Sequence, residues 1–305
     1  MNNILFVNHI YEQCGIYQFG KMLGDALIKS SKYKFKYEEI DSTDKFYDHF
    51  ALYAPKVIIF NYNPSSSPWL NKHILEFCRQ TCKVGAIYHH HPVDGFDFYI
   101  HPNPLLKESS NNFVTNRLIL NYEDEYKNND IPVIGSFGFG LPIKGYDKIV
   151  TIVNDEFDEA IIRLNLTPSY FGDPDCVIAK ETAKLCQKAM RKNKIHLQIT
   201  HDFLSIPQTL DFLAGNSINI FCYHSTRSTG LSSAIDLALS VKRPIAITRS
   251  TMFDHILEAD PSICLDTNNL KTILNNGIFP LMPFYEKYRC GNVIKDYENI
   301  IDKLI

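Results

Sequence analysis

Residues 224–255 carry the groups best suited to bind a phosphate. Apolar residues in this stretch recur at the spacing of a helix face, at Ala234, Leu237, Ala238 and Val241. Ser232 and Ser233 fall in the first turn of that helix, where backbone N–H groups and the helix dipole favour an anion. Asp236 follows on the same face and could accept hydrogen bonds from ribose hydroxyls. The alternative is a helix capped by serine or threonine, with a solvated aspartate.

Three consecutive histidines follow the fourth apolar run of the sequence, in a segment that reads YHHHPVD at residues 88–94. Adjacent residues on an extended chain point in different directions and rarely converge on one ion, so a metal site is not expected here. For the same reason at most two of the three side chains can face a common ligand. We predict that His90 and His91 are those two.

His201 and Asp202 follow the apolar run at residues 195–200. In parallel α/β sheets, ligands bind beyond the carboxyl ends of the strands, and both residues lie at such an end. The alternative gives this segment a structural role, in which Asp202 or Ser205 caps the helix that follows.

The length of 305 residues suggests two domains, at about 150 residues per domain. Hydrophobic residues make up 45% and charged residues 21% of the chain, with a mean hydropathy of -0.16, as in ordinary folded proteins. The net charge of -3 provides no broad positive field for a phosphate backbone. Nucleic acid is therefore disfavoured as a general partner, although the net charge does not exclude a local basic groove.

The eight cysteines are scattered, and the closest pair, Cys78 and Cys82, has no second pair that would complete a zinc set. We interpret all eight as reduced thiols. The N-terminus lacks the basic and long apolar segments of a signal peptide, and no stretch approaches the roughly 18 apolar residues of a membrane span. We therefore expect a protein of the reducing cytoplasm.

The first half of the chain alternates apolar strands with helical patterns. Strands are expected at residues 3–7, 35–40, 56–61 and 83–88, and helices after Gly15 and at 47–53 and 69–78. This alternation indicates βαβ units and a parallel sheet. The runs VIIF and VGAIY are apolar on both faces, as the interior strands of such a sheet are. The first half is thus predicted to be a Rossmann-like domain.

A second series of elements begins with IPVIGSFGFG at residues 131–140. Further strands are expected at 160–166, 195–200, 218–223 and 244–248, and helices after Lys144 and at 180–191, 208–214 and 229–241. Residues 94–130 are rich in proline, serine, asparagine and charged residues, so we expect loops and the domain junction there. The predicted fold class is α/β, with two Rossmann-like domains that face each other across a cleft and bind ligand at the strand ends.

The segment that contains Asp236 resembles the nucleotide-sugar signature of the retaining glycosyltransferases with two facing Rossmann-like domains. This is the GT-B fold of the large group 4, or group 1-like, class. Asp236 occupies the second acidic position of that signature, Ala238 follows it, and RPIAI at residues 243–247 matches the next strand. The first acidic position, which contacts the sugar ring in the family, is Ser228 in this chain.

A second segment, GSFGFGLPIKG at residues 135–145, resembles the family's loop that ends in Lys-Gly. Gly138 lies in this loop, and Lys144 matches the lysine that neutralises the donor diphosphate. The family commonly has an arginine five residues before the lysine, where this chain has Phe139. Arg227 could supply the missing cation, or it could be a solvated loop residue.

The resemblance also implies the remaining site residues. The CGIY segment around Gly15 resembles the family's first loop, in which a glycine approaches the diphosphate and the acceptor. The family often has a histidine after the fourth strand, where it lines the donor sugar. His201 and Asp202 lie where the family places the nucleotide base. The implied catalytic residues are His90, His91 and Lys144, and the implied donor-binding residues are Gly15, Gly138, Lys144, His201, Asp202, Arg227, Gly230, Ser232, Ser233 and Asp236.

The function implied by the resemblance is transfer of a sugar from a UDP- or GDP-sugar donor to an acceptor hydroxyl, with retention of configuration. It implies no permanently bound cofactor and no metal. The implied acceptor is a glycan or a lipid-linked glycan, which allows for peripheral contact with the inner membrane face. The expected domains are residues 1–128 for the acceptor, 129–285 for the nucleotide sugar, and 286–305 as a helix that returns to the first domain.

Three alternatives stay open. Because the first acidic residue and the arginine of the family are missing, the chain could be a non-catalytic or altered nucleotide-sugar-binding protein. A glycosyltransferase of the phage type, acting on modified DNA bases, is the second. The third is another two-domain enzyme, an epimerase or a dehydrogenase. Against a dehydrogenase, GSFGFG has its glycines at the first, fourth and sixth places and so lacks the Gly-x-Gly-x-x-Gly pattern.

Overall fold

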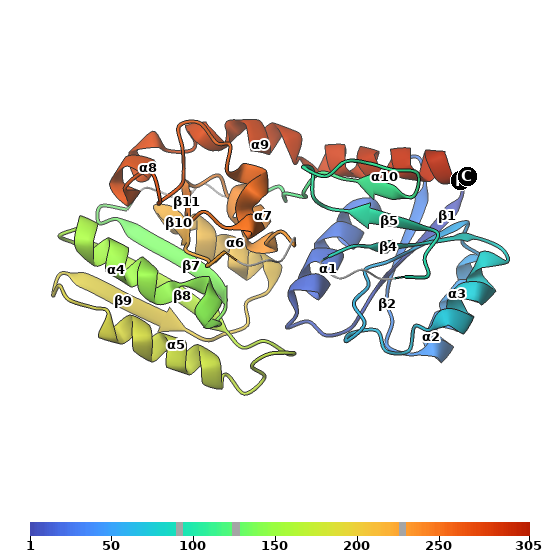
Figure 1. Ribbon diagram of the computed structural model, residues 1–305, viewed down its shortest axis with the longest axis horizontal. Coiled ribbons are helices and arrows are strands. Elements are labelled where there is room, and N and C mark those ends of the chain that lie inside the picture. The colour runs from blue at the N-terminus through green and yellow to red at the C-terminus, as the bar shows by residue number, and fades with distance from the viewer. Residues whose placement is uncertain (90–93, 124–128, 226–229) are drawn as a thin grey trace. The chain divides into compact units, whose positions relative to one another are not determined.

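The computed structural model describes residues 1–89, 94–123, 129–225 and 230–305. The chain divides into two compact units. The N-terminal unit consists of Met1–Leu118 and Tyr288–Ile305, and the C-terminal unit consists of Ile119–Lys287. Each unit contains one parallel sheet with helices packed against it (Figure 1).

The sheet of the N-terminal unit has six strands in the order β2-β1-β3-β4-β5-β6, and all neighbouring pairs are parallel. Its strands are β1 (Asn3–Asn8), β2 (Lys34–Glu39), β3 (Val57–Phe60), β4 (Lys83–Ile87), β5 (Phe98–His101) and β6 (Asn112–Val114). Its helices are α1 (Gly15–Leu27), α2 (Thr43–Tyr53), α3 (Lys72–Arg79) and α10 (Cys290–Leu304). The predicted parallel sheet of the first half is confirmed.

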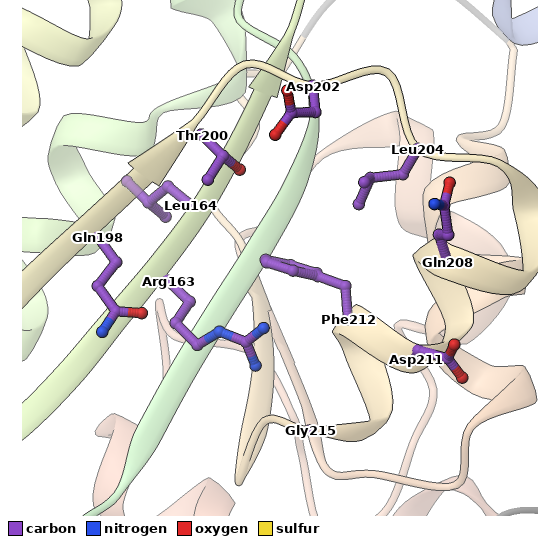
Figure 2. A pocket seen from close by; sticks show the side chains of 10 residues that line it. All are labelled: Arg163, Leu164, Gln198, Thr200, Asp202, Leu204, Gln208, Asp211, Phe212 and Gly215. Carbon is purple, nitrogen blue, oxygen red and sulfur yellow. The ribbon is translucent and has the colours of Figure 1, made fainter.

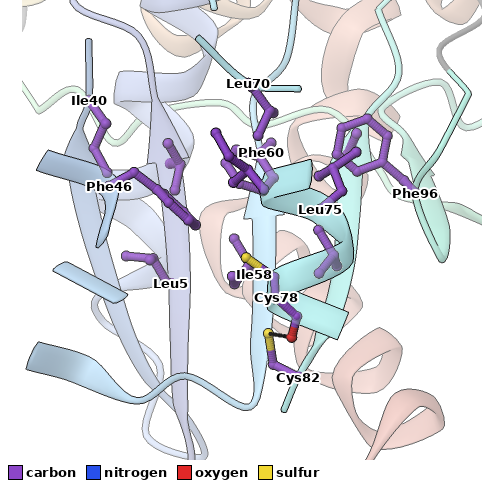
Figure 3. Packing of buried hydrophobic residues seen from close by; sticks show 14 residues of the cluster. Leu5, Ile40, Phe46, Ile58, Phe60, Leu70, Leu75, Cys78, Cys82 and Phe96 are labelled. Carbon is purple, nitrogen blue, oxygen red and sulfur yellow. Dashed lines mark hydrogen bonds between the residues drawn. The ribbon is translucent and has the colours of Figure 1, made fainter. Parts of the chain in front are cut away.

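The hydrophobic core of this unit lies where α2 and α3 cover the sheet (Figure 3). Phe46 of α2 is fully buried, and its ring centroid lies 5.7 Å from that of Phe60 on β3 and 5.5 Å from that of Trp69. All four residues of β3 are buried, because a central parallel strand is covered on both faces. The apolar run VIIF that predicted this strand therefore contributes its side chains to the core.

The predicted loop region at residues 94–130 contains two strands, β5 and β6, so that part of the prediction is wrong. Phe98 and Ile100 of β5 are buried and alternate with half-buried neighbours, and Phe113 of β6 packs against Phe98. A Cβ at Gly85 would collide with the Phe98 ring, so β4 and β5 fit together only with glycine there. Both strands are too short to be recognised among the prolines and asparagines that flank them.

The sheet of the C-terminal unit has five strands in the order β11-β10-β7-β8-β9, again all parallel. Its strands are β7 (Val133–Phe139), β8 (Ala160–Thr167), β9 (Ile195–Thr200), β10 (Ile218–Phe221) and β11 (Ile245–Ile247). Its helical segments are η1 (Pro142–Lys144), α4 (Tyr146–Glu156), α5 (Val177–Lys188), α6 (Ile206–Ala214), α7 (Ser233–Ser240), η2 (Thr251–Ile256), α8 (Leu270–Asn276), η3 (Phe279–Leu281) and α9 (Met282–Lys287). The predicted second Rossmann-like sheet is confirmed.

The two units meet along the chain at Leu118 and Ile119, before the expected boundary between residues 128 and 129. The residues after this point are already bonded to the C-terminal unit. The Leu120 backbone N–H donates to Ser240 Oγ at 2.8 Å, and Tyr122 Oη donates to Asp211 Oδ1 at 2.9 Å. These bonds assign the start of the connection to the C-terminal unit.

Helix α10 returns to the N-terminal unit, as the sequence predicts. Its apolar face is buried, and its polar side chains bond to the same unit. Ser30 Oγ donates to Glu298, Tyr33 Oη donates to Asp302, and the Asn116 backbone N–H donates to Asp296 Oδ2 at 2.9 Å. In the described parts of the chain, no helix combines the length and apolar character needed to cross a bilayer.

The packing of α10 predicts a stability difference between two of its positions. Ile301 is fully buried whereas Asn299 is exposed. We expect Ile301→Ala to lower the free energy of unfolding by about 2–5 kcal/mol, the usual cost of a large-to-small change in a core. Asn299→Ala, the control, should change it by less than about 0.5 kcal/mol. Urea denaturation measures both, and equal midpoints for Ile301→Ala and wild type would show that α10 does not pack as described.

Candidate functional site

Lys144 lies at the carboxyl end of the C-terminal sheet, held by a turn that follows β7. It is the last residue of η1, and Gly145 then adopts a left-handed conformation with φ of 63° before α4 begins. A Cβ at Gly145 would collide with the carbonyl oxygen of Cys222, so a larger residue does not fit. The His224 backbone N–H donates to Ile143 O at 2.9 Å and ties the turn to the segment after β10.

The ammonium group of Lys144 lies over an aromatic ring. Its Nζ atom is 3.6 Å from the centroid of Tyr223, which follows β10 and is 2% exposed. No described carboxylate forms an ion pair with Lys144, and Tyr223 Oη has no hydrogen-bond partner among the described residues. Buried hydroxyls are normally bonded, and a cation beside an unbonded donor is suited to hold an anion.

Gly138, which the structure places in β7 and not in the loop that follows, brings the strand backbone close to two tyrosine hydroxyls. A Cβ at this glycine would lie 3.3 Å from Tyr146 Oη and 3.9 Å from Tyr223 Oη. Tyr146 is fully buried, and this burial, followed by the neighbouring Tyr223, raises the pKa of its phenol well above the ordinary value. The Tyr146 phenol therefore stays protonated near neutral pH, and its Oη donates to Phe139 O at 3.5 Å.

Helix α7 carries the predicted phosphate-binding serines and Asp236. Ser232 is its N-cap, Ser233 is its first residue, and the Ser232 side chain accepts no hydrogen bond from the first turn. Asp236 is 1% exposed, so the alternative of a solvated aspartate is wrong. A carboxylate is not normally buried without polar or charged partners, and this one lies one turn behind the helix start.

The structure brings the start of α7 and Lys144 into one neighbourhood through η2. The Ser232 backbone N–H donates to Met252 O at 3.1 Å. The next residue, Phe253, has its ring centroid 4.7 Å from that of Tyr223, on which Lys144 lies. Three segments that are distant in sequence thus meet at the carboxyl end of the sheet.

His201 and Asp202 lie at the end of β9, as predicted, and both are held by β8. The His201 Nδ1–H donates to Leu166 O at 2.8 Å, and Asn165 Nδ2 donates to Asp202 O at 3.1 Å. The sequence analysis also allowed that Asp202 or Ser205 caps the helix that follows. Ser205 does so, because it forms a capping box with Gln208 at the start of α6. Asp202 does not cap that helix.

A cavity of about 430 Å³ runs between β8, β9 and α6, and Asp202 lies at one end of it (Figure 2). Its lining is formed by Arg163, Leu164, Gln198, Thr200, Asp202, Leu204, Gln208, Asp211, Phe212 and Gly215. The Arg163 guanidinium lies 4.6 Å from the Phe212 centroid and donates to Asn216 Oδ1 at 3.1 Å. The cavity therefore combines a largely apolar lining with charged side chains of both signs.

The N-terminal unit contains two polar residues that the sequence analysis missed. Asn8 ends β1 and Asn61 follows β3, and each is 1% exposed. The signal that could have revealed them is a polar residue directly after an apolar run, since such a residue lies at the functional edge of a parallel sheet. Tyr223 was also missed, because the sequence analysis includes it in the strand predicted at residues 218–223, whereas β10 ends at Phe221.

The predicted site residues fall into five groups. Gly138, Lys144, Ser232, Ser233 and Asp236 lie in the neighbourhood of Tyr223 and α7. His201 and Asp202 lie at the end of β9, and Gly15 is the first residue of α1 in the other unit. Gly230 is half-buried just before α7. The predicted residues His90, His91 and Arg227, and also Ser228, lie outside the described residues.

Among the residues that the structure describes, no three His, Cys, Asp or Glu side chains are grouped to hold a metal ion. All eight cysteines are free. Burial raises the pKa of several of these thiols, with that of Cys186 at about 12. A buried thiol of this kind is protonated at neutral pH and packs as an apolar group.

The chain resembles known proteins in its three-dimensional structure but not detectably in its sequence. No family model matches the sequence, and the search of curated proteins found no match. Sucrose-phosphate synthase from Thermosynechococcus elongatus aligns over 100% of this chain and 99% of its own, with a TM-score of 0.68 and 11% identity. HepE from Anabaena, in complex with UDP and glucose, aligns over 100% of both chains, with a TM-score of 0.62 and 10% identity.

A third similar structure is an α,α-trehalose-phosphate synthase (UDP-forming) from Burkholderia xenovorans in complex with glucose-6-phosphate. It covers 100% of both chains, with a TM-score of 0.65 and 8% identity. At such identities the likeness concerns the fold. The chain has the two-domain GT-B fold that these glycosyltransferases share, and the predicted fold class is confirmed.

The turn that holds Lys144 predicts a cost for changing Gly145. A left-handed conformation costs a residue with a Cβ roughly 1–2 kcal/mol, and the contact with Cys222 adds to this. We expect Gly145→Ala to lower the free energy of unfolding by more than about 1 kcal/mol. The control is Gly172→Ala, whose Cβ would lie 3.5 Å from Ser169 Oγ, an ordinary contact. Equal urea midpoints for the two variants would contradict the prediction.

Proposed function

We propose that this protein is a glycosyltransferase that moves a sugar from a nucleoside-diphosphate sugar to an acceptor hydroxyl. The observation that carries the proposal is the placement of Lys144. This lysine has no described carboxylate partner, lies beside the unbonded hydroxyl of Tyr223, and is connected through η2 to the start of α7. Such a set is suited to a diphosphate, and the GT-B fold adds support.

We assign the donor to the C-terminal unit. The Lys144 ammonium would neutralise the diphosphate, the first turn of α7 would bind a phosphate, and Asp236 would accept hydrogen bonds from the ribose. As the bond from the anomeric carbon to the phosphate oxygen breaks, negative charge develops on the leaving diphosphate. A fixed cation stabilises that charge and so lowers the barrier. His201 and Asp202 are proposed to lie beside the base.

We further propose that the configuration at the anomeric carbon is retained. We assign no described residue as the nucleophile of a covalent intermediate, because the carboxylate grouped with Lys144, Asp236, is assigned to the ribose. In a front-face reaction the acceptor oxygen bonds to the anomeric carbon as the phosphate oxygen leaves, and the acceptor proton passes to that phosphate. The ligands named for two similar structures support a UDP-sugar donor and a sugar acceptor. HepE is in complex with UDP and glucose, and the trehalose-phosphate synthase is in complex with glucose-6-phosphate.

The acceptor is proposed to be a glycan or lipid-linked glycan held by the N-terminal unit, with Gly15 at the start of α1 facing the substrates. A lipid-linked acceptor would require peripheral contact with a membrane. No metal or permanently bound cofactor is required by this scheme, because the cation at the diphosphate is the lysine. His90, His91 and Arg227 are proposed to contribute from outside the described residues.

A non-catalytic nucleotide-sugar-binding protein is the second candidate. It is favoured by Phe139 and Ser228, which replace the arginine and the first glutamate of the family pattern. A panel of UDP- and GDP-sugars, assayed for both binding and release of the nucleoside diphosphate, separates the two functions. Turnover supports the transferase, whereas tight binding without turnover of any donor would refute it.

Removal of the Lys144 ammonium should weaken binding of every diphosphate. A hydrogen bond to a charged group contributes about 1.5–3 kcal/mol, so Lys144→Ala should raise the Kd for both UDP and pyrophosphate by at least about tenfold. Isothermal titration calorimetry at constant salt measures this. Lys148→Ala, one turn further along and exposed, is the matched control and should bind as wild type does. Unchanged affinity in Lys144→Ala would refute the assigned site.

Asp236 should affect only ligands that carry a ribose. Asp236→Asn keeps the side-chain shape but removes the charge, and it should raise the Kd for UDP about 3- to 10-fold while leaving that for pyrophosphate unchanged. The same titrations measure both ligands. If pyrophosphate binding falls as much as UDP binding, Asp236 does not bind the ribose.

A further inference from the structure

The outer face of α5, in the C-terminal unit, carries a row of lysines. Lys180, Lys184 and Lys188 follow one another at intervals of four residues, so their side chains lie on one side of the helix. All three are exposed, and none forms an ion pair with a carboxylate of the described residues. The side of the helix that faces the unit is formed by Ala179, Thr182, Ala183 and Cys186.

The acidic residues at the end of the neighbouring helix α4 are already paired. Helix α4 packs beside α5 (Figure 1). Arg191 pairs with Asp155 of α4 at 2.5 Å, and Lys192 pairs with Asp158 at 3.1 Å. Both bases belong to the turn after α5, so these pairs leave the lysines of α5 uncompensated.

The segment around α5 is positively charged although the chain as a whole is negative. Residues 174–194 contain six basic side chains against two acidic ones, Asp175 and Glu181, within a chain of net charge -3. The basic residues are Lys180, Lys184, Lys188, Arg191, Lys192 and Lys194. A local excess of this kind favours an anionic partner.

Apolar side chains are exposed on the same face of α5. Val177 is 56% exposed and Leu185 is 49% exposed. Each lies three residues before a lysine, Val177 before Lys180 and Leu185 before Lys188, so apolar and basic side chains are neighbours on the helix surface.

Two exposed aromatic residues lie in the loop before α5. Tyr170 and Phe171 are each 47% exposed, and their ring centroids are 4.9 Å apart. A single exposed apolar residue needs no explanation, but four of them within residues 170–185 indicate an interaction surface. We call the four apolar residues and the three lysines the α5 surface: Tyr170, Phe171, Val177, Lys180, Lys184, Leu185 and Lys188.

A closed turn ties the aromatic pair to the start of α5. The Ser169 backbone N–H donates to Asp173 O at 3.2 Å, and the Asp173 backbone N–H donates to Ser169 O at 2.8 Å. The Asp173 carboxylate is buried and accepts hydrogen bonds from the second and third backbone N–H groups of α5, at 3.0 and 2.8 Å. Tyr170 and Phe171 are thus held at the tip of a turn that is bonded to the helix.

The combination of basic and apolar side chains distinguishes between anionic partners. Lysines alone would suit a nucleic acid as well as a membrane. The exposed Val177 and Leu185 gain nothing from a phosphate backbone, whereas at a bilayer surface apolar and aromatic side chains enter the boundary between headgroups and acyl chains. A second copy of this chain is disfavoured, because two basic faces repel each other.

We propose that the α5 surface docks onto a membrane that contains anionic lipids. The three lysines contact the headgroups, and the four apolar side chains insert between them. This inference goes beyond the proposed function, which names membrane contact only for a lipid-linked acceptor and assigns no surface to it. It also holds independently of the reaction, because docking needs neither a nucleotide sugar nor an acceptor.

Cosedimentation with vesicles, in the absence of any nucleotide sugar, tests the lysines. Wild type should bind vesicles of phosphatidylglycerol and phosphatidylcholine in equal parts, bind pure phosphatidylcholine much more weakly, and lose binding as salt is raised. Each basic residue near an anionic surface contributes about fivefold, so the variant with Lys180→Gln, Lys184→Gln and Lys188→Gln should bind about 100-fold more weakly. Wild type that does not bind the anionic vesicles would overturn the proposal.

The matched control removes the same charge from three exposed lysines outside the α5 surface. The variant with Lys107→Gln, Lys242→Gln and Lys271→Gln should lose less than about threefold, because charges far from the bilayer are screened. Circular dichroism shows that both triple variants are folded. Equal losses in the two would show that binding follows net charge alone, and would overturn the proposal.

Phe171→Trp tests whether the aromatic tip enters the bilayer. The chain has one natural tryptophan, Trp69 in the N-terminal unit, so the difference from the wild-type spectrum reports on position 171. Anionic vesicles should shift this emission to shorter wavelength, and brominated lipids should quench it. Emission that brominated lipids leave unchanged would overturn insertion.

The same variants distinguish a membrane from a nucleic acid. Wild type should bind double-stranded DNA more weakly than anionic vesicles at equal salt. Tighter binding to DNA, lost in the Lys180, Lys184 and Lys188 variant, would assign the α5 surface to nucleic acid and overturn the proposal. A protein that binds vesicles through this surface but turns over no nucleotide sugar would support docking and refute the proposed transferase.

Discussion

The constraint on which this structure depends is that polar groups at the ends of buried parallel strands must be hydrogen-bonded. An unsatisfied buried group costs about 1–3 kcal/mol, and parallel strands bring all such groups to one edge of the sheet. The two units meet this constraint in different ways. In the N-terminal unit, Asn8 and Asn61 bond to each other and to the backbone. In the C-terminal unit, Tyr223 Oη has no partner among the described residues. The first arrangement has its hydrogen bonds formed without a ligand, and the second leaves a hydroxyl that a ligand could bond.

Close packing of backbone against polar side chains supports both arrangements. In α1, Gly20 and Gly24 let the helix rest on the amides and on Tyr37, where any side chain would push them apart. In the other unit, Gly145 does the same for the turn that ends in Lys144, against the carbonyl of Cys222. In both units, glycines therefore allow the backbone to lie directly on neighbouring groups. A substitution at these positions would displace those groups without removing them.

Much of the fold could be predicted from the sequence because buried parallel strands appear as apolar runs, as VIIF in β3 does. Strands β5 and β6 were not predicted, because Phe98 and Phe113 lie in short strands among prolines and asparagines, which are typical of turns. Lys144 was singled out by the resemblance to a family signature, and Asp236 also by its position on the predicted helix; their roles stay predictions. Asn8 and Asn61 were not recognised, because an asparagine after a strand looks like a turn residue until neighbouring strands bring such residues together. Tyr223 was not recognised either, because its ring contacts the ammonium group of Lys144, a residue distant in sequence.

The partner of Lys144 explains how a cation can be held in place and still be available to a ligand. A cation over an aromatic ring gains about 0.5–1 kcal/mol where water reaches it, and about 2 kcal/mol when it is desolvated. Breaking a buried ion pair by removing one charge costs about 3–5 kcal/mol. A lysine paired with a buried carboxylate would thus be slow to give up its partner for a diphosphate. Over the Tyr223 ring, 3.6 Å from its centroid, the ammonium is oriented at small cost, and no carboxylate of the described residues forms an ion pair with it. At the proposed site, a diphosphate would thus gain the charge interaction without displacing a carboxylate of the described residues.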